Sequence, residues 1–312
     1  MLTYLVVLLD DTSVSFCHYD VNRTERKLIG IDSLKEAILF AMKENLNIQF
    51  VYPDYVLPQE YRDIIDSIDH TKLGPVSCGE DLEMTIVEYL DFEPDKEKAY
   101  LWRCSLQRLN EEAKVIADLL PKVSRLNVVL TDIHLWKEVS FALYKSTLEY
   151  LAKDIAEYYK QGLAVQLNLL TDRIMLSKMN NCNAGDTSIT LAPDGCFYIC
   201  PAYYPKHSVG NLKEGLSIPN KQLYRLDHAP ICRKCDAFQC RRCIWLNEML
   251  TLDCNTPSHE QCVAAHIERN ASRSLLGLLN NNGVYLENSL EIEEINYLDP
   301  FNIFNKWNQG KS

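Results

Sequence analysis

Hydrophobic residues in the first 175 positions form short runs that alternate with longer amphipathic stretches. Short apolar runs rich in β-branched and aromatic residues predict buried strands, whereas apolar residues spaced by three or four predict helices. The predicted strands cover residues 5–9, 48–52, 85–89, 99–102, 126–130 and 165–169. The predicted helices cover residues 33–45, 58–68, 110–120 and 141–159, the first opening on a capping-box pattern at Ser33 and Glu36. This alternation predicts an α/β fold, either an open parallel sheet or an incomplete (β/α) barrel, with ligands bound at the carboxyl ends of the strands.

Composition narrows the class of protein. A chain of 312 residues with 47% hydrophobic residues can bury a sizeable core and still form a second small domain. The net charge of −11 argues against nucleic acid as the main partner. The apolar run at Tyr4–Leu9 is short and is closed by two aspartates, and an apolar span of membrane length is absent from the sequence. We therefore expect neither a signal peptide nor a membrane helix, and a cytoplasmic location in which cysteines stay reduced.

Cysteine is concentrated in the second half of the chain. Four cysteines form the run Cys-x2-Cys-x4-Cys-x2-Cys between Cys232 and Cys243. Thiolates at this spacing, in a chain without a secretory signal, indicate ligands to a soft metal centre more than a disulfide framework. The cysteines of this region are Cys182, Cys196, Cys200, Cys232, Cys235, Cys240, Cys243, Cys254 and Cys262.

The number and spacing of these cysteines favour iron–sulfur clusters over zinc. A structural zinc ion takes four ligands, and the segment 236–239 is short for two separate zinc knuckles. Iron–sulfur clusters tolerate compact runs, and the Cys200–Pro201 step also occurs in ferredoxin motifs. Structural zinc and inert buried thiols remain the alternatives.

The order of the cysteines resembles the SPASM domain of radical-SAM peptide-modifying enzymes. The matching features are the spacing Cys182-x12-Gly195-x4-Cys200, then the four-cysteine run, then a downstream cysteine. The resemblance implies two [4Fe–4S] clusters, although the usual central run is CxxC-x5-C-x3-C and this chain has x4 and x2. Carried over by position, the first cluster would be held by Cys182, Cys200 and Cys243, with Cys196 a possible fourth ligand. The second would be held by Cys232, Cys235, Cys240 and Cys262, which leaves Cys254 as a spare.

The loop after the first predicted strand departs from the radical-SAM pattern. Radical-SAM enzymes carry CxxxCxxC at this place, whereas here Asp10 and Val14 stand at the first two ligand positions and Cys17 at the third. The glycine-rich segment that follows the second strand in those enzymes is replaced by residues 52–55, Tyr-Pro-Asp-Tyr. We therefore expect that the chain does not bind S-adenosylmethionine. Cys17 is a candidate catalytic thiol or a relic.

Over most of its length the chain resembles the CXXX-repeat peptide maturase family, whose members lack the radical-SAM cysteines. The matching stretches are 101–106, 129–132, 167–173 and, most specifically, 232–270. The resemblance implies a radical-SAM-like α/β domain followed by a small SPASM-like iron–sulfur domain. It also implies two partners, a separate radical SAM peptide maturase and a ribosomally made precursor peptide with repeated Cys-x-x-x units.

Three functions are compatible with these observations. The favoured one is an iron–sulfur subunit that binds the precursor or relays electrons for the radical SAM enzyme, so that the chain itself is an accessory protein. The alternatives are a stand-alone iron–sulfur or thiol redox enzyme acting on the peptide, and a zinc-stapled adaptor. The predicted division of the chain is 1–178 for the α/β domain, 179–270 for the cluster domain and 271–312 for a helical and acidic tail.

A few polar residues outside the cysteine pattern are secondary candidates. Histidines and an acid beside the last cysteine could act as ligands, but Ser258 and Gln261 have capping-box spacing, which favours a helix start there. Three charged residues follow predicted strands, where they could meet a substrate or form salt bridges. The candidates are His259, Glu260, His266, Asp132, Asp172, Arg173 and the basic residues Arg233, Lys234, Arg241 and Arg242.

Overall fold

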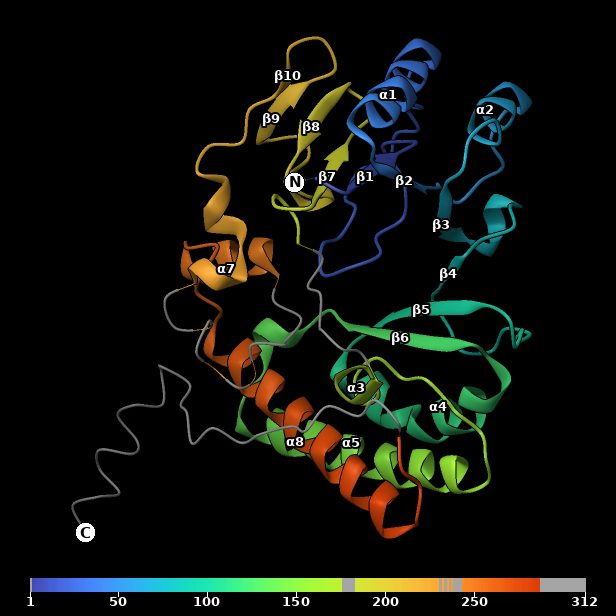
Figure 1. The fold of residues 1–312 in the computed structure, drawn as a ribbon, viewed down its shortest axis with the longest axis vertical. Coiled ribbons are helices and arrows are strands. Elements are labelled where there is room, and N and C mark those ends of the chain that lie inside the picture. The colour runs from blue at the N-terminus through green and yellow to red at the C-terminus, as the bar shows by residue number, and fades with distance from the viewer. Residues whose placement is uncertain are drawn as a thin grey trace, which may run out of the picture. The chain divides into compact units, whose positions relative to one another are not determined.

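The computed structural model describes residues 2–175, 183–229, 232, 235, 237 and 243–286, and within them the chain forms two compact units (Figure 1). Unit 1 comprises Met1–Tyr89, Lys98–Arg103 and Cys182–Arg225. Unit 2 comprises Leu90–Glu97, Cys104–Asn181 and Leu226–Ser312. Both units combine residues that are far apart in the sequence. The division into 1–178, 179–270 and 271–312 stays a prediction.

Unit 1 contains a mixed sheet with the strand order β10-β9-β8-β7-β1-β2-β3-β4-β5. Strands β7, β1, β2, β3, β4 and β5 pair in parallel, and β7, β8, β9 and β10 pair antiparallel. The predicted parallel sheet is therefore confirmed. The strands are β1 Tyr4–Leu8, β2 Asn47–Val51, β3 Thr71–Pro75, β4 Met84–Val87, β5 Ala99–Cys104, β7 Ser188–Leu191, β8 Cys196–Tyr198, β9 Ser208–Asn211 and β10 Gly215–Leu216.

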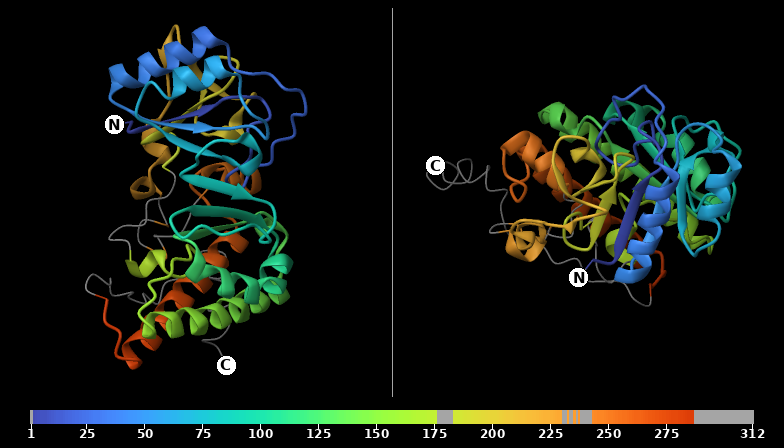
Figure 2. Two further views of the ribbon diagram at one scale, coloured as in Figure 1. Left: turned by 90° about the vertical axis from the view of Figure 1, so that its right-hand side faces the viewer. Right: turned by 90° about the horizontal axis from the view of Figure 1, so that it is seen from above.

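Helix α1 (Ile31–Glu44) covers one face of this sheet (Figure 2). Its buried positions recur at helical spacing and join the core formed by alternate residues of β1 and β2. The helix ends at Asn45, whose φ of 53° lies in the left-handed region that asparagine tolerates. The predicted capping box is wrong, because the helix begins at Ile31 and Ser33 lies inside its first turn. The residues of α1 in the core are Leu34, Ala37, Ile38 and Ala41.

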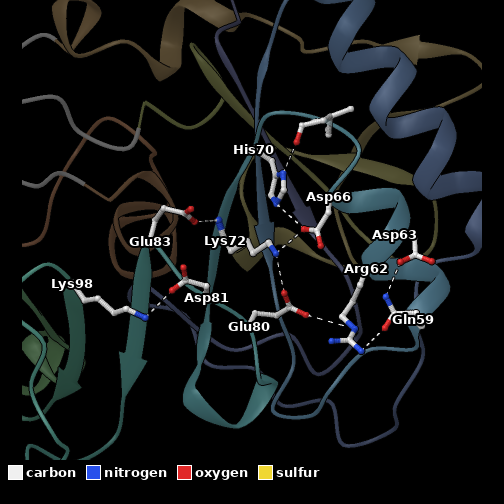
Figure 3. A network of polar contacts seen from close by, with 11 residues as sticks. Gln59, Arg62, Asp63, Asp66, His70, Lys72, Glu80, Asp81, Glu83 and Lys98 are labelled. Atoms are coloured by element: carbon white, nitrogen blue, oxygen red, sulfur yellow. Dashed lines mark hydrogen bonds and ion pairs between the residues drawn. The ribbon is translucent and has the colours of Figure 1, made fainter.

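A polar network links α2 (Gln59–Ile65), the segment after it and β3 (Figure 3). The ammonium of Lys72 lies 2.8 Å from both Asp66 and Glu80, and the side chains of Lys72 and Glu80 are only 12% and 7% exposed. This polarity explains why β3 is missing from the predicted elements. Its sequence Thr-Lys-Leu-Gly-Pro lacks the apolar, β-branched character of a predicted strand.

Unit 2 is largely helical, with α5 and α8 packed against each other (Figure 1). The predicted helix at 110–120 begins earlier and is interrupted at Glu112. The helices are α3 Leu106–Glu111, α4 Ala113–Leu119, α5 Glu138–Lys160, α6 Asp172–Met175, α7 Ile244–Thr251 and α8 His259–Asn281, and the strand is β6 Arg125–Leu130. Short 3-10 turns cover Val76–Cys78, Leu120–Lys122, Ile133–Leu135, Pro201–Tyr203, Lys221–Tyr224 and Leu226–His228.

The predicted strand at 165–169 is reduced to a single parallel bridge, Leu126 to Leu167. The side chain of Asn168 accepts from the N–H of Val128 and donates to its carbonyl, both at 2.8 Å. Backbone bonds join the segment to β6 only at Leu126, and the side chain of Asn168 extends the pairing to Val128. Thr171 then closes a turn on Leu167. Among the described helices, none has the length and apolar character required to cross a membrane.

Candidate functional site

The loop that follows β1 is anchored to the neighbouring strand at its first turn. The N–H of Asp10 donates to the hydroxyl of Ser13 at 3.0 Å, and that hydroxyl donates to the carbonyl of Val51 at 2.7 Å. The N–H of Val14 donates to the carbonyl of Tyr52 at 3.1 Å. The residues at the first two expected cluster positions therefore belong to a hydrogen-bonded turn.

Asp10 is fully buried, and both oxygens of its carboxylate accept hydrogen bonds. Oδ1 accepts from the N–H of Thr12 at 2.8 Å and from its hydroxyl, and Oδ2 accepts from the hydroxyl of Tyr55 at 3.0 Å. Burial, followed by this hydrogen bond, raises the pKa of Tyr55. Asp10 thus acts as a structural acceptor for the loop.

Arg103 at the end of β5 fixes the part of the loop that carries Cys17. Its Nε donates to the carbonyl of Cys17 and its Nη2 to the carbonyl of Tyr19, both at 2.8 Å, and Nη2 also lies 2.6 Å from Asp20. Burial raises the pKa of Tyr19 well above its usual value, and the nearby thiols of Cys17 and Cys200 raise it further. The structure therefore brings Cys17 and Cys200 into electrostatic range of the same phenol.

The segment around Cys200 is tied to the same loop by aromatic and charged groups. The hydroxyl of Tyr204 donates to Asp11 at 2.6 Å. Arg23 donates to the carbonyls of Asp11 and Tyr204, at 3.0 and 3.1 Å, and its guanidinium lies 4.0 Å from the centre of the Tyr204 ring. A guanidinium over an aromatic face adds a cation–π attraction to these bonds.

Cys196 is the first residue of β8, four positions before Cys200. Its N–H donates to Asp194 at 2.9 Å, and burial together with that carboxylate raises the pKa of the Cys196 thiol. Both cysteines belong to unit 1. Cys182, the expected companion ligand, lies outside the described residues.

In unit 2, the pair Cys232 and Cys235 forms a tight turn. The N–H of Cys235 donates to the carbonyl of Cys232 at 3.1 Å, and Cys232 is 8% exposed. The sulfur of Cys235 lies 3.4 Å from Nε2 of His266 on α8. His266 follows Cys262 by one helical turn, so the two share a face of α8.

Two more predicted ligands lie at helix starts. Cys243 is the N-cap of α7, where its sulfur accepts from the N–H of Leu246 at 3.5 Å. Cys262 lies in the first turn of α8, whose predicted capping box of Ser258 and Gln261 is confirmed. The positive end of a helix dipole favours a thiolate over a thiol.

The described part of unit 2 contains four of the predicted ligands, but Cys240 lies outside it, as do the basic residues Arg233, Lys234, Arg241 and Arg242. A group of three or more His, Cys, Asp or Glu side chains close enough for one metal ion is not found among the described residues. The ligand set for a metal centre therefore stays a prediction. Of the secondary candidates, His266 contacts Cys235 and His259 packs edge-on against Phe141.

Besides Cys17, three cysteines that the structure describes lie outside the predicted ligand set: Cys78, Cys104 and Cys254. Cys78 and Cys104 are buried in their units, and burial raises the pKa of each thiol, that of Cys104 to about 12. A buried thiol with a raised pKa is a poor nucleophile. The carbonyl of Cys254 accepts from the side chain of Asn247 at 2.9 Å. That Cys254 is a spare stays a prediction.

The strand-end acids, Asp132 and Asp172, form structural contacts. Asp132 accepts from the N–H of Leu106 at the start of α3 and from the indole of Trp136, at 3.1 and 3.2 Å. Asp172 forms an ion pair of 2.7 Å with Arg125.

Arg173, the third strand-end candidate, forms an ion pair of 3.0 Å with Glu268 of α8. The hydroxyl of Tyr144 donates to the other oxygen of Glu268 at 2.8 Å. Sequence reasoning missed the role of Glu268, although a signal was available. An acid at a helical position flanked by Ala264, Ala271 and Leu275 lies on an apolar face and needs a buried partner.

No family model matches the sequence, and no match is found among curated proteins. Solved structures do match in fold. Native anSMEcpe with bound AdoMet and Cp18Cys peptide has a TM-score of 0.61 at 13% identity, covering 89% of this chain and 99% of that chain. Histidine-tagged anSMEcpe with bound AdoMet gives 0.60 at 12% identity, and native anSMEcpe with bound AdoMet gives 0.59 at 12%, both with the same coverage. The chain therefore shares the fold of anSMEcpe.

The expectation that the chain does without S-adenosylmethionine is wrong, because the structures that share its fold were solved with AdoMet bound. That expectation came from two short segments, the loop at 10–17 and the segment 52–55. The similarity extends over 89% of the chain. The differences at residues 10–17 and 52–55 were therefore not sufficient to predict that S-adenosylmethionine does not bind.

Proposed function

We propose that this chain acts in the maturation of a ribosomally made precursor peptide with Cys-x-x-x repeats, as an iron–sulfur protein in complex with a separate radical SAM maturase. The supporting observation is the combination of a fold shared with AdoMet- and peptide-bound structures and nine cysteines after position 181. The peptide bound in one of those structures supports a peptide as the substrate class. The cysteines supply ligands for clusters.

The described cysteines fit the iron–sulfur group in their chemistry. The turn at Cys232 and Cys235 holds two sulfurs on one short segment, and Cys243 and Cys262 lie at helix starts that stabilise thiolates. In this proposal the first cluster is held by Cys182, Cys200 and Cys243, with Cys196 a possible fourth ligand, and the second by Cys232, Cys235, Cys240 and Cys262. When bound, such clusters supply one-electron transfer.

The proposed reaction uses S-adenosylmethionine. In this proposal the residues of unit 1 around Cys17 shape the strand-end loop, with Arg103 and Arg23 holding its backbone in place. The two arginines contribute position, and the radical chemistry is supplied by the cofactors.

The test is a reconstituted reaction under anaerobic conditions with precursor peptide, S-adenosylmethionine, reductant and the radical SAM maturase. Mass spectrometry of the precursor should show modification that depends on this chain. The variant Cys235→Ala should lower it strongly, whereas Cys78→Ala, which alters a buried thiol in unit 1, should not. Equal modification rates with and without this chain would contradict the proposal.

A further inference from the structure

His266 lies in the interior of α8 and contacts a predicted metal ligand. Its Nε2 atom lies 3.4 Å from the sulfur of Cys235, a residue 31 positions earlier in the sequence. Helix capping does not account for this histidine, because the start of α8 is capped by Ser258 and Gln261. Both His266 and Cys235 are half-buried, so neither side chain is sealed inside the core.

A second predicted ligand lies on the same helix as this histidine. Cys262 precedes His266 by one helical turn, and side chains at this spacing share one face of a helix. The N–H of Cys235 donates to the carbonyl of Cys232 at 3.1 Å, which places a third predicted ligand on the segment that His266 contacts. The histidine therefore lies among the ligands that are predicted for the second cluster.

The contact between the two side chains has a defined donor once the cysteine binds metal. A metal-bound cysteine is a thiolate, which accepts hydrogen bonds and has no proton to donate. A neutral imidazole donates from one ring nitrogen and accepts at the other. Metal binding at Cys235 therefore selects the tautomer of His266 that carries its hydrogen on Nε2, the nitrogen beside the sulfur.

A separation of 3.4 Å would also suit a sulfur and a nitrogen that bind one and the same ion. In a tetrahedral zinc site, Zn–S of about 2.3 Å and Zn–N of about 2.0 Å place the two donor atoms roughly 3.5 Å apart. A [4Fe–4S] cluster differs, because four cysteines serve four irons and each iron takes one protein ligand. In the proposed cluster His266 therefore hydrogen bonds to the sulfur of Cys235 and does not share its iron.

We propose that His266 donates its Nε2–H to the metal-bound sulfur of Cys235 and thereby raises the reduction potential of the cluster that this cysteine holds. The inference rests on the proposed function, since it requires the cluster. A hydrogen bond to a cluster sulfur offsets part of the negative charge that an added electron brings, so it favours the reduced state. His266 is a positioning residue, because it acts through Cys235 and not on the substrate.

The experiment measures the cluster reduction potentials of the full-length protein by titration with dithionite in the absence of oxygen. His266→Leu removes the donor and should lower one of the two potentials. His266→Gln supplies a side-chain amide that can donate to the same sulfur, so it should bring that potential back toward the wild-type value. His134→Leu alters an exposed histidine of the same unit and should leave both potentials unchanged. Equal potentials in wild type and His266→Leu, at equal iron content, would overturn the inference.

A second measurement, on the wild-type protein, decides the question if His266→Leu loses its iron or fails to fold. Protein labelled with ¹⁵N-histidine and then reduced should show a weakly coupled histidine nitrogen in electron–nuclear double resonance (ENDOR) spectra. This signal should be absent from the labelled His266→Gln protein. A strongly coupled nitrogen would show that His266 is itself a metal ligand, and the absence of any coupled histidine nitrogen would show that the hydrogen bond is not formed. Either result would overturn the inference.

These outcomes separate the hydrogen bond from the proposed function. Protein with about eight irons, whose potentials do not respond to the change at His266, would keep the cluster proposal and reject the hydrogen bond. Potentials that do respond, in a protein that fails to promote modification of the precursor, would keep the hydrogen bond and reject the role in maturation. Zinc in place of iron would reject both.

Discussion

The loop at 10–28 in unit 1 and the cysteine-bearing segments of unit 2 are stabilised in different ways. The loop is fixed by charged and aromatic side chains, with Arg103 and Arg23 holding its carbonyls at 2.8–3.0 Å. The contacts of Cys235 and Cys243 are longer, at 3.4 and 3.5 Å, and involve sulfur. Bonds from a charged donor contribute more than contacts to a thiol.

The difference indicates which region needs a ligand. The residues that hold the loop in place are supplied by unit 1 itself, so we expect its conformation not to depend on bound metal. The cysteine segments present thiols at helix starts and in a tight turn, where metal coordination would add most of the local stability. The same fold therefore combines a self-sufficient loop with a region that we expect to be metal-dependent.

The largest expected effect is the loss of iron from the cysteine segments of unit 2. Replacing Cys235 with Ala should remove about four of roughly eight irons, since one [4Fe–4S] cluster loses a ligand, and should destabilise the segment that contacts His266 of α8. Iron and sulfide analysis gives the first result and hydrogen exchange in α8 gives the second. Unchanged iron content in folded Cys235→Ala protein would remove this residue from the ligand set.

Glu268→Ala should destabilise unit 2 by about 3–5 kcal/mol, because it leaves the buried Arg173 without its carboxylate. Glu268→Gln should cost less, since its amide oxygen can still accept from Arg173. Urea unfolding measures both. Solvent-exposed ion pairs contribute up to about 1 kcal/mol. A loss of stability below that value for Glu268→Ala would therefore show that Arg173 has another partner in the folded protein.

Arg103→Met should loosen the loop of unit 1 by about 1–3 kcal/mol, because three contacts from one guanidinium are lost. Cys17, whose carbonyl is one of the acceptors, should then react faster with a thiol reagent. Metal content should not change. If Arg103→Met lowered iron as much as Cys235→Ala, the contrast between the two regions would fail.

Alkaline pH should weaken the loop region of unit 1. Burial raises the pKa of Tyr19, Tyr55 and Tyr204 in the folded protein, so each phenol favours its neutral form there. Their contribution to stability is fully present below the unfolded pKa of about 10 and is lost as the pH rises above it. Absorbance of tyrosinate against pH, with Tyr55→Phe as comparison, should show this loss as a smaller pH dependence in the variant.

The smallest expected effect is at the start of α8. Ser258→Ala should cost about 1 kcal/mol, because it removes one half of the capping box. Thermal unfolding measures the loss. A much larger loss, accompanied by release of iron, would tie the cap directly to the neighbouring Cys262.

Much of the α/β architecture could be predicted from sequence, because β1 is a continuous apolar run and β2 carries Ile48, Phe50 and Val51 on a strand of high β-propensity. The strand β3 could not be predicted, because Lys72 and Gly74 interrupt its apolar pattern. It is stabilised instead by the ion pair of Lys72 with Glu80. The expected strand at 165–169 shortens to one bridge, because beyond Leu126 the pairing with β6 is made by the side chain of Asn168.

Interactions between residues close in the sequence could be predicted from sequence. Interactions that depend on tertiary packing could not. The capping box at Ser258 could be predicted from local spacing alone. The roles of Arg103 and Glu268 depend on partners more than 80 residues away in the sequence, at Cys17 and Arg173, which periodicity does not reveal. The S-adenosylmethionine expectation erred because two loops were given more weight than the fold.

The most direct test of the central claim is the iron, acid-labile sulfide and zinc content of protein prepared without oxygen. Two [4Fe–4S] clusters would give about eight irons and about eight sulfides per chain, with zinc far below one equivalent. Near-stoichiometric zinc without acid-labile sulfide would contradict the account and would leave a zinc-stapled adaptor as the function of this chain.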